Sequence, residues 1–179
     1  MIFLTVGTQF PFDRLVRAVD EAAGRGLLWE EVFAQIGAAD YKPVNFKWVG
    51  ELPKSEYAEM VSRASAIVGH AGMGTIVMAL EAGKPLLVMP RLPEFGEIVN
   101  YHQVATGRKF AALGHVLMAK DEAEIAARLG ELEEFKPKER VARGEKVVER
   151  VAGFLEALRT QRTPSPPTEA QRYRENRRP

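Results

Sequence analysis

Short apolar runs rich in β-branched residues alternate along this chain with longer amphipathic stretches, and this alternation constrains the fold more than any other feature. The runs predict strands over residues 2–6, 32–36, 45–49, 66–69, 86–89 and 115–118. The amphipathic stretches predict helices over residues 12–23, 55–64, 76–82, 98–110, 122–133 and 137–158. Strands separated by helices at this spacing form right-handed βαβ units. We therefore predict an α/β fold, a Rossmann-like and mostly parallel sheet with helices on both faces.

The length of the chain predicts one globular domain. With 179 residues, 46% of them hydrophobic and 27% charged, it is long enough to bury one full core, which we place at residues 1–159. Residues 160–179 are rich in proline and arginine and have almost no apolar side chain. Such a segment buries too little surface to offset the entropy of ordering, so we expect a disordered tail. The alternative is a basic segment that touches anionic lipid or an acidic partner.

Charge and cysteine content exclude several classes of function. The formal net charge is +1, which argues against a nucleic-acid partner held by a basic face. The chain has no cysteine, so disulfides, thiolate catalysis and sulfur-ligated metals are excluded. The apolar run at residues 1–6 is too short for a signal peptide or a membrane span. We expect a cytoplasmic protein whose contact with a membrane is peripheral or made through a partner.

A glycine motif stands between one expected strand and the next helix. Residues 70–75 read His-Ala-Gly-Met-Gly-Thr. A helix N-terminus presents unpaired backbone N–H groups and the positive end of the helix dipole. Gly72 and Gly74 let a diphosphate approach the backbone closely, and Thr75 adds a hydroxyl donor. The motif therefore predicts an anion site, and a tight strand-to-helix turn without a ligand is the alternative.

Ligands of open parallel sheets bind at the carboxyl ends of the strands, where the following loops converge. The loops so placed are residues 7–9, 50–52, 70–75 and 90–100. The last of them, with the helix start after it, carries a polar cluster of Arg91, Glu94, Glu97, Asn100, His102 and Gln103. Paired donors and acceptors of this kind suit the recognition of sugar hydroxyls. The alternative is a solvated loop in which Glu97 simply favours the helix N-terminus.

Taken together, these loops resemble a known family. Gly-Thr-Gln at 7–9, the motif at 70–75, and the segments at 83–91 and 95–103 look like the C-terminal, donor-binding domain of glycosyltransferase family 28. Within that family the chain is most similar to small bacterial PssE/EpsE-type subunits of split polysaccharide glycosyltransferases. These in turn resemble the soluble subunit of the eukaryotic dolichol-linked N-acetylglucosamine transferase. The resemblance covers about residues 1–120 and implies the C-terminal half of a GT-B enzyme.

The resemblance also implies an activity. The chain would be the donor-binding catalytic subunit of an inverting enzyme that moves a hexose from a UDP-sugar to a polyprenyl-diphosphate-linked acceptor in exopolysaccharide or capsule synthesis. Its partner would be a membrane-associated, acceptor-binding PssD-type subunit that holds it at the inner face of the plasma membrane. A homo-oligomer is possible when the subunit is alone. No cofactor or metal is implied, and the chain has no Asp-x-Asp pair to chelate one.

Residue roles are carried over from the family by position. Amides of the 70–75 motif would hold the UDP diphosphate, the 7–9 loop would line the opposite wall, and the 50–52 backbone would pair with the uracil edge. The polar cluster would face the donor sugar. The substrate-binding residues implied in this way are Gly7, Thr8, Gln9, Gly50, Glu51, Leu52, His70, Ala71, Gly72, Met73, Gly74, Thr75, Arg91, Glu97, Asn100, His102 and Gln103.

Catalytic residues are less defined than binding residues. His70 and Glu97 are the candidates, but a general base must reach the acceptor hydroxyl, which the other subunit delivers. We therefore favour a positioning role for His70, and an imidazole that is merely bonded to nearby loop backbone is the alternative. In the family, the base would more naturally come from the partner domain.

Two positions depart from the family pattern. Met78 stands where many relatives have a ribose-binding glutamate, and Glu81, one turn further on, is either its substitute or a surface acid. Ile98 follows Gly96-Glu97 where relatives have histidine, which puts the identity of the donor sugar in doubt. These departures keep open a regulatory nucleotide-sugar-binding module without activity. A homodimeric isomerase-like enzyme is a third reading, and its need for a complete second domain argues against it.

Overall fold

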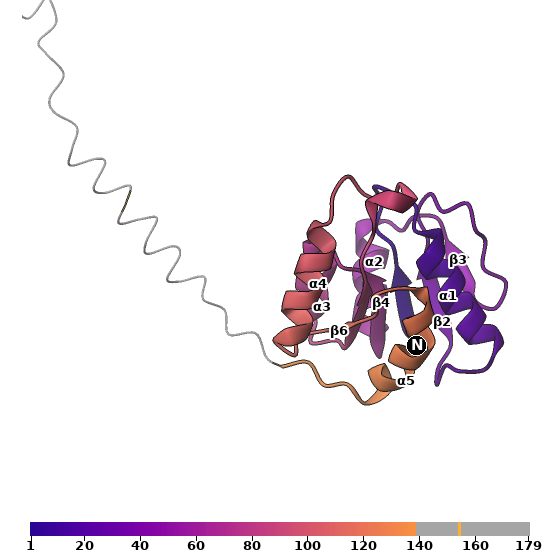
Figure 1. The fold of residues 1–179 in the computed structure, drawn as a ribbon. Helices are drawn as coiled ribbons and strands as arrows, with labels where there is room; N and C mark the ends of the chain where they lie inside the picture. The colour runs from indigo at the N-terminus through magenta and orange to yellow at the C-terminus, as the bar shows by residue number, and fades with distance from the viewer. Residues whose placement is uncertain (139–153, 155–179) are drawn as a thin grey trace, which may run out of the picture. The chain divides into compact units, whose positions relative to one another are not determined.

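The computed structural model describes residues 1–138 and residue 154, and within them the chain forms an α/β fold, a parallel β-sheet with helices packed against it (Figure 1). The strands are β1 (Ile2–Thr5), β2 (Val32–Gln35), β3 (Lys47–Val49), β4 (Ala66–His70), β5 (Leu86–Met89) and β6 (Leu117–Met118). The helices are α1 (Asp13–Gly24), α2 (Lys54–Arg63), α3 (Met73–Glu81), α4 (His102–Ala112) and α5 (Ile125–Glu134), with short 3₁₀ turns η1 (Pro93–Phe95) and η2 (Glu122–Glu124). The predicted fold class is confirmed.

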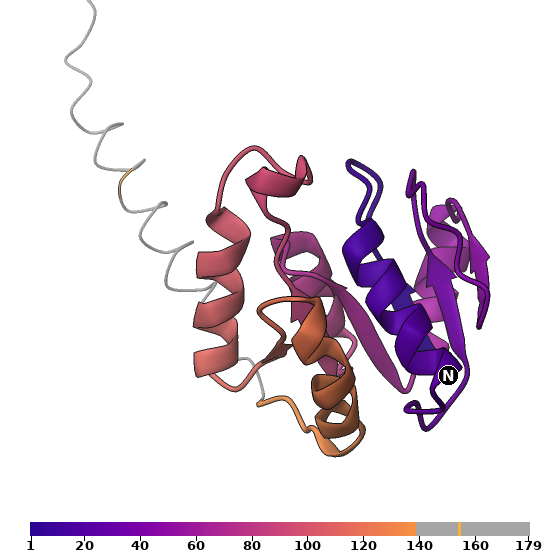
Figure 2. The same cartoon turned by 45° about the vertical axis from the view of Figure 1, so that its right-hand side comes forward.

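Two apolar clusters cover the two faces of the sheet, because alternate side chains of a strand point to opposite faces. Ile2 and Leu4 of β1 pack with α1 and α5, whereas Phe3 between them packs with α2 and α3. The same alternation divides β4 and β5. Figure 2 shows α1 and α5 next to each other on one face, and they are in direct contact. The central strands β1, β4 and β5 are thus buried on both sides, which explains their continuous apolar runs in the sequence.

The strand order is β3-β2-β1-β4-β5-β6, and every neighbouring pair is parallel. Thr5, at the end of β1, is in register with Gln35 of β2 and with Gly69 of β4. The chain therefore leaves β1 toward one side of the sheet and β4 toward the other. Such a reversal opens a crevice at the carboxyl ends of the two strands, where ligands of doubly wound folds bind.

A buried carboxylate fixes the approach to β3. Asp20 of α1 is 1% exposed and accepts hydrogen bonds from the Tyr41 hydroxyl at 2.7 Å and from the backbone N–H of Asn45 at 2.8 Å. Residues 44 and 45 are therefore held by α1, and β3 begins at Lys47 rather than at residue 45.

Other element boundaries also differ from the sequence prediction. The helix predicted at 76–82 begins at Met73, and the helix predicted at 98–110 begins at His102. The last strand is shorter than 115–118, and the predicted 122–133 helix starts as a 3₁₀ turn. Of the helix predicted at 137–158, residues 137 and 138 are not helical and most of the rest lies outside the described residues, as does the tail at 160–179. No helix in the described part is both long and apolar enough to cross a membrane.

Candidate functional site at the carboxyl edge of the sheet

The start of α3 presents free backbone donors beside the β1–β4 crevice. The first intrahelical bond runs from the Ile76 N–H to the Gly72 carbonyl at 3.1 Å. The N–H groups of Met73, Gly74 and Thr75 precede it and have no hydrogen-bond partner among the described residues. The first turn also carries no acidic side chain that would neutralise the helix dipole. Three donors and a positive dipole end are therefore available to an anion.

His70 organises this turn. The Gly72 N–H donates to Nδ1 of His70 at 3.1 Å, so the neutral ring carries its proton on Nε2, which lies 3.0 Å from the Thr75 hydroxyl oxygen. The Thr75 hydroxyl then accepts from His70 and keeps its own proton for a ligand. Burial and the nearby charge of Arg91 lower the pKa of His70 from 6.5 to about 4. The ring is a weak base with both nitrogens engaged, which fits the positioning role.

One detail of the predicted diphosphate site changes with this geometry. The Gly72 N–H points to the His70 ring and is not free for a ligand. The Ala71 N–H is also used, because it donates to the Met89 carbonyl at 3.2 Å. The free donors in the 70–75 motif are therefore the amides of its last three residues. The diphosphate site at this motif stays a prediction.

Glycines bring the loops of three strands together at this edge. Gly7 follows β1 with φ of +73°, and a Cβ on it would lie 3.1 Å from Nε2 of His70. Gly37 follows β2 with φ of +56°, and a Cβ there would lie 2.8 Å from the Gly7 carbonyl oxygen. Its N–H donates to the carbonyl of Gly50, which follows β3. Only glycine allows both the left-handed backbone and this close approach.

Arg91 ties the segment after β5 to the loop after β1. It is 3% exposed, and its Nη2 donates to the carbonyl oxygens of Val6, at 2.6 Å, and Phe10. Its backbone N–H donates to the side-chain oxygen of Gln103, whose amide nitrogen lies 3.3 Å from Nδ1 of His70. Burial lowers the pKa of Arg91 to about 10, an effect that Glu97 opposes, so the guanidinium stays charged at neutral pH. A buried positive charge thus lies near His70, whose ring contacts the first turn of α3.

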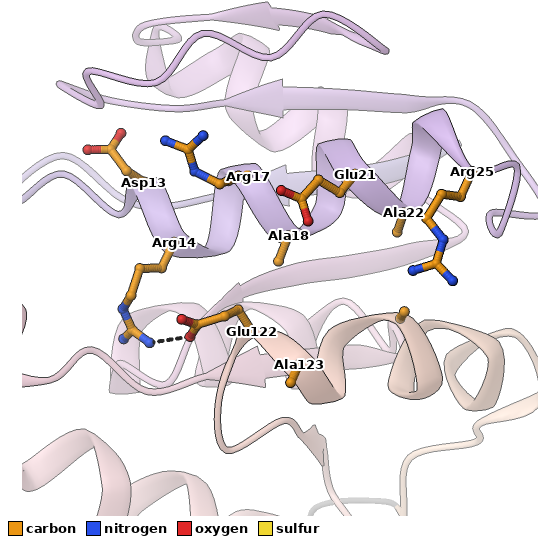
Figure 3. A pocket seen from close by; sticks show the side chains of 10 residues that line it. Asp13, Arg14, Arg17, Ala18, Glu21, Ala22, Arg25, Glu122 and Ala123 are labelled. Atoms are coloured by element: carbon orange, nitrogen blue, oxygen red, sulfur yellow. Dashed lines mark hydrogen bonds and ion pairs between the residues drawn. The ribbon is translucent and has the colours of Figure 1, made fainter.

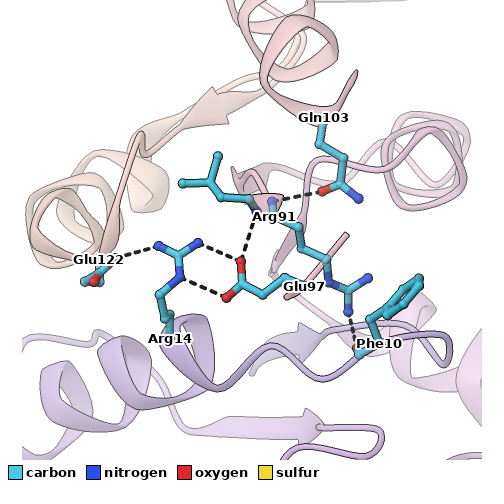
Figure 4. A network of polar contacts seen from close by, with 7 residues as sticks. Phe10, Arg14, Arg91, Glu97, Gln103 and Glu122 are labelled. Atoms are coloured by element: carbon cyan, nitrogen blue, oxygen red, sulfur yellow. Dashed lines mark hydrogen bonds and ion pairs between the residues drawn. The ribbon is translucent and has the colours of Figure 1, made fainter. Parts of the chain in front are cut away.

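Glu97 is engaged within the protein (Figure 4). Its two carboxylate oxygens accept from Nε and Nη2 of Arg14, both at 2.8 Å, and one of them also accepts from the Leu92 N–H at 3.0 Å. The Glu97 side chain is 6% exposed. The Glu97 carboxylate therefore makes a structural contact. It is neither open toward a sugar nor free to act as a catalytic group.

The remaining predicted residues are mostly exposed around this edge. Thr8, Gln9 and Met73 face solvent, and so do Asn100 and His102. The Asn100 side-chain oxygen accepts from the His102 N–H at 3.0 Å and contacts Nδ1 of the same residue. This Asx turn directly precedes α4, which begins at His102 and not at Ile98.

Residues 50–52 lie at the end of β3, two strands away from β1. Leu52 packs against the apolar cluster under α2, and Glu51 is exposed. Within the described residues no hydrogen bond joins this loop to His70 or Thr75, so its predicted role toward the uracil rests on its position at the same sheet edge.

At the predicted ribose position the structure shows no acid. Met78 packs on the apolar cluster between the sheet and α2 and α3. Glu81 is exposed at the last position of α3, about 12 Å along the helix axis from Met73, against about 7.5 Å for Met78. Glu81 therefore lies farther from the free amides than the position it would replace.

A separate cavity of about 430 Å³ lies between α1, η2 and α5 (Figure 3). Alanine side chains of α1, η2 and α5 line it from both sides, together with the charged side chains Arg14, Arg17, Glu21 and Glu122. None of the predicted site residues lines it. In the described part of the chain, no group of three or more histidine or acidic side chains is placed to hold a metal ion.

The sequence prediction missed Arg14 and Gly37. Gly37 follows an expected strand directly, as Gly7 does, so its position at a strand exit was the available signal. Arg14 gives no such signal, because its partner Glu97 is 83 residues away in the sequence.

Comparison with known proteins gives three kinds of similarity. The family model described as "Glycosyltransferase family 28 C-terminal domain" matches residues 1–156. The human "UDP-N-acetylglucosamine transferase subunit ALG13" is 27% identical over an alignment of 124 residues that covers 64% of this chain and 10% of that protein. The chain therefore spans about a tenth of the length of this relative.

Solved structures share the fold. The NMR structure of ALG13 aligns with a TM-score of 0.52 at 22% identity, over 76% of this chain and 87% of that one. The glycotransferase of kitacinnamycin aligns with a TM-score of 0.55 at 21% identity, over 89% of this chain and 39% of that one. MurG of Acinetobacter baumannii aligns with a TM-score of 0.51 at 22% identity, over 73% and 39%.

Proposed function

Because this chain belongs to the family of glycosyltransferase family 28 C-terminal domains, we propose that its described domain binds the UDP-sugar donor of a divided, inverting glycosyltransferase. The observation that carries the proposal is the group of three unpartnered amides at the start of α3, beside the β1–β4 crevice. Their geometry suits a diphosphate, and the positive charge of Arg91 nearby favours the same ligand. The Thr75 hydroxyl, oriented by His70, adds a fourth donor.

In this proposal the domain stabilises the leaving group. The acceptor hydroxyl oxygen attacks the anomeric carbon, the bond from that carbon to the β-phosphate oxygen breaks, and the hydroxyl proton passes to a base. Negative charge then accumulates on the departing UDP, where the α3 amides and the helix dipole stabilise it without a metal. His70 is poorly suited to be the base, since its pKa is lowered to about 4. We therefore place the base in the acceptor-binding partner.

The partner and the acceptor are further parts of the proposal. We propose a membrane-associated PssD-type subunit that brings a polyprenyl-diphosphate-linked acceptor, and a hexose as the transferred group, in exopolysaccharide synthesis at the inner face of the plasma membrane. The human relative is named as a subunit of a transferase, which supports a divided enzyme. The resemblance of the 83–91 and 95–103 segments to bacterial PssE/EpsE-type subunits supports the acceptor class.

Isothermal titration of the purified full chain with UDP, UDP-glucose, UDP-galactose, UDP-glucuronate and UDP-N-acetylglucosamine tests the proposal, each with Mg²⁺ and with a chelator. We expect UDP binding that does not depend on the metal, and a preference for one sugar. Thr75→Val removes one hydrogen bond to a charged group, worth about 1.5–3 kcal/mol, and is expected to weaken UDP binding by roughly 10- to 150-fold. Thr75→Ser keeps the hydroxyl and serves as the matched control.

A chain that binds none of these nucleotides, alone or with a co-expressed PssD-type partner, contradicts the proposal. The absence of an acid at Met78 favours one second candidate, a regulatory module that binds the nucleotide-sugar without transferring the sugar. The partner complex separates the two candidates, because only the enzyme releases UDP when donor and acceptor are both present.

A further inference from the structure

Arg14 makes a two-pronged contact with the segment that follows β5. Its Nε and Nη2 each donate to one carboxylate oxygen of Glu97 at 2.8 Å, and its Nη1 donates to Glu122 at 2.7 Å. The guanidinium carbon lies 4.1 Å from the centre of the Phe95 ring. Its side chain is 13% exposed, and that of Glu97 is 6% exposed. Figure 4 shows the guanidinium between the two carboxylates, which come from different parts of the fold.

The segment at residues 92–101 depends on side chains for its position. Its backbone hydrogen bonds in the described structure are the local turns from Phe95 to Leu92 and from Gly96 to Pro93, with the first bond of α4 at its end. No backbone bond joins residues 92–101 to a neighbouring strand or loop in the described part of the chain. The Arg14 to Glu97 pair therefore connects the segment to α1, and Arg91, just before the segment, connects it to the loop after β1.

The geometry of this contact requires an arginine, and another cationic side chain cannot replace it. Two parallel N–H to oxygen bonds fix both the distance and the angle between α1 and the segment, and the third donor fixes the guanidinium to η2. A lysine offers one point charge and lacks the planar face that stacks on Phe95. Burying this pair costs solvation free energy, so such a pair is better suited to fix a geometry than to add stability.

We propose that Arg14 is a positioning residue that sets the sugar selectivity of the donor site by holding the 92–101 segment through Glu97. The inference rests on the proposed function, in which Asn100 near the end of this segment, and His102 and Gln103 in the first turn of α4 directly after it, face the donor sugar. The α3 amides that face the diphosphate belong to a different loop. Loosening the segment therefore weakens recognition of the sugar and leaves recognition of UDP itself in place.

Hydrogen–deuterium exchange of the full chain, without any ligand, tests whether Arg14 holds the 92–101 segment. In Arg14→Lys and in Glu97→Asp, which both keep the charges, we expect the hydrogen-bonded amides of this segment, those of Leu92, Phe95 and Gly96, to exchange at least tenfold faster. Glu122→Gln removes only the charge of the more exposed partner, and Arg63→Lys alters an exposed pair on α2; exchange in both is expected to stay within threefold of wild type. Unchanged exchange at 92–101 in the two charge-preserving variants overturns the proposal.

Titration of the same variants with UDP and UDP-sugars tests whether this contact sets the sugar selectivity. We expect the Kd for UDP to stay within threefold, while the preference for the best UDP-sugar over UDP falls at least tenfold in Arg14→Lys and Glu97→Asp. An equal loss for UDP and for UDP-sugar assigns Arg14 a general structural role and refutes the selectivity. A wild-type chain that binds no UDP contradicts the proposed function instead, and the exchange experiment still decides whether Arg14 holds the segment.

Discussion

Acid should destabilise this domain through His70 before its carboxylates titrate. The ring is neutral in the folded chain because burial and Arg91 lower its pKa to about 4, whereas in the unfolded chain it titrates near 6.5. Above both values neither state binds a proton and the ring contributes no pH dependence. Between them only the unfolded chain is protonated, so stability falls as the pH decreases from 6.5 toward 4.

The two pKa values give the size of the effect. Linkage predicts that the free energy of unfolding decreases by about 1.3 kcal/mol between about pH 7.5 and about pH 5.5 because of this one group. The comparison is with His70→Asn, whose side-chain oxygen can still accept the Gly72 N–H but does not titrate. Effects of the carboxylates are common to both proteins and cancel in the difference.

Urea unfolding followed by circular dichroism at the two pH values measures the effect. The difference in stability between wild type and His70→Asn should shift by about 1.3 kcal/mol toward the variant as the pH is lowered. A difference that does not change with pH means that the ring titrates near its ordinary pKa in the folded protein. That result would refute the burial and the two hydrogen bonds of the His70 ring. It would also refute the orientation of the Thr75 hydroxyl, which depends on them.

Further expectations concern single side chains. A Cβ on Gly74 meets nothing within 4 Å, so Gly74→Ala should raise the melting temperature slightly, because alanine favours helices. Calorimetry should show weaker UDP binding by this variant, because the added methyl group stands among the free amides. Asp20→Ala removes a buried acceptor of several hydrogen bonds and should cost roughly 2–4 kcal/mol of stability in urea unfolding, with Asp20→Asn less damaging. Glu81→Gln should change the Kd for UDP less than twofold, as expected for a surface acid; a larger loss would assign Glu81 to the ribose.

The fold and the family were predictable because their signals are local. Strands buried on both faces give continuous apolar runs, and glycines at strand exits give short motifs in a fixed order. Helix boundaries were predicted less well. Glycine is a poor helix former, which hid the first turn of α3 at Met73 and Gly74, whereas Ile98 and Val99 imitated the apolar spacing of a helix that begins later. In both cases the hydrogen bonds of a neighbouring side chain, His70 or Asn100, explain the observed start.

The two ends of the candidate site differ in how far sequence can predict them. At the diphosphate end three of the four donors are backbone amides, so their presence follows from a strand, a glycine turn and a helix, and only the Thr75 hydroxyl is a side-chain donor. At the sugar end the donors are side chains on a segment whose position depends on Arg14, 83 residues from Glu97 in the sequence. Glu97 therefore has the local pattern of a residue that faces a sugar, although its contacts hold the loop. Variants near α3 should accordingly alter affinity for every UDP compound alike, and variants of Arg14 should alter the choice among them.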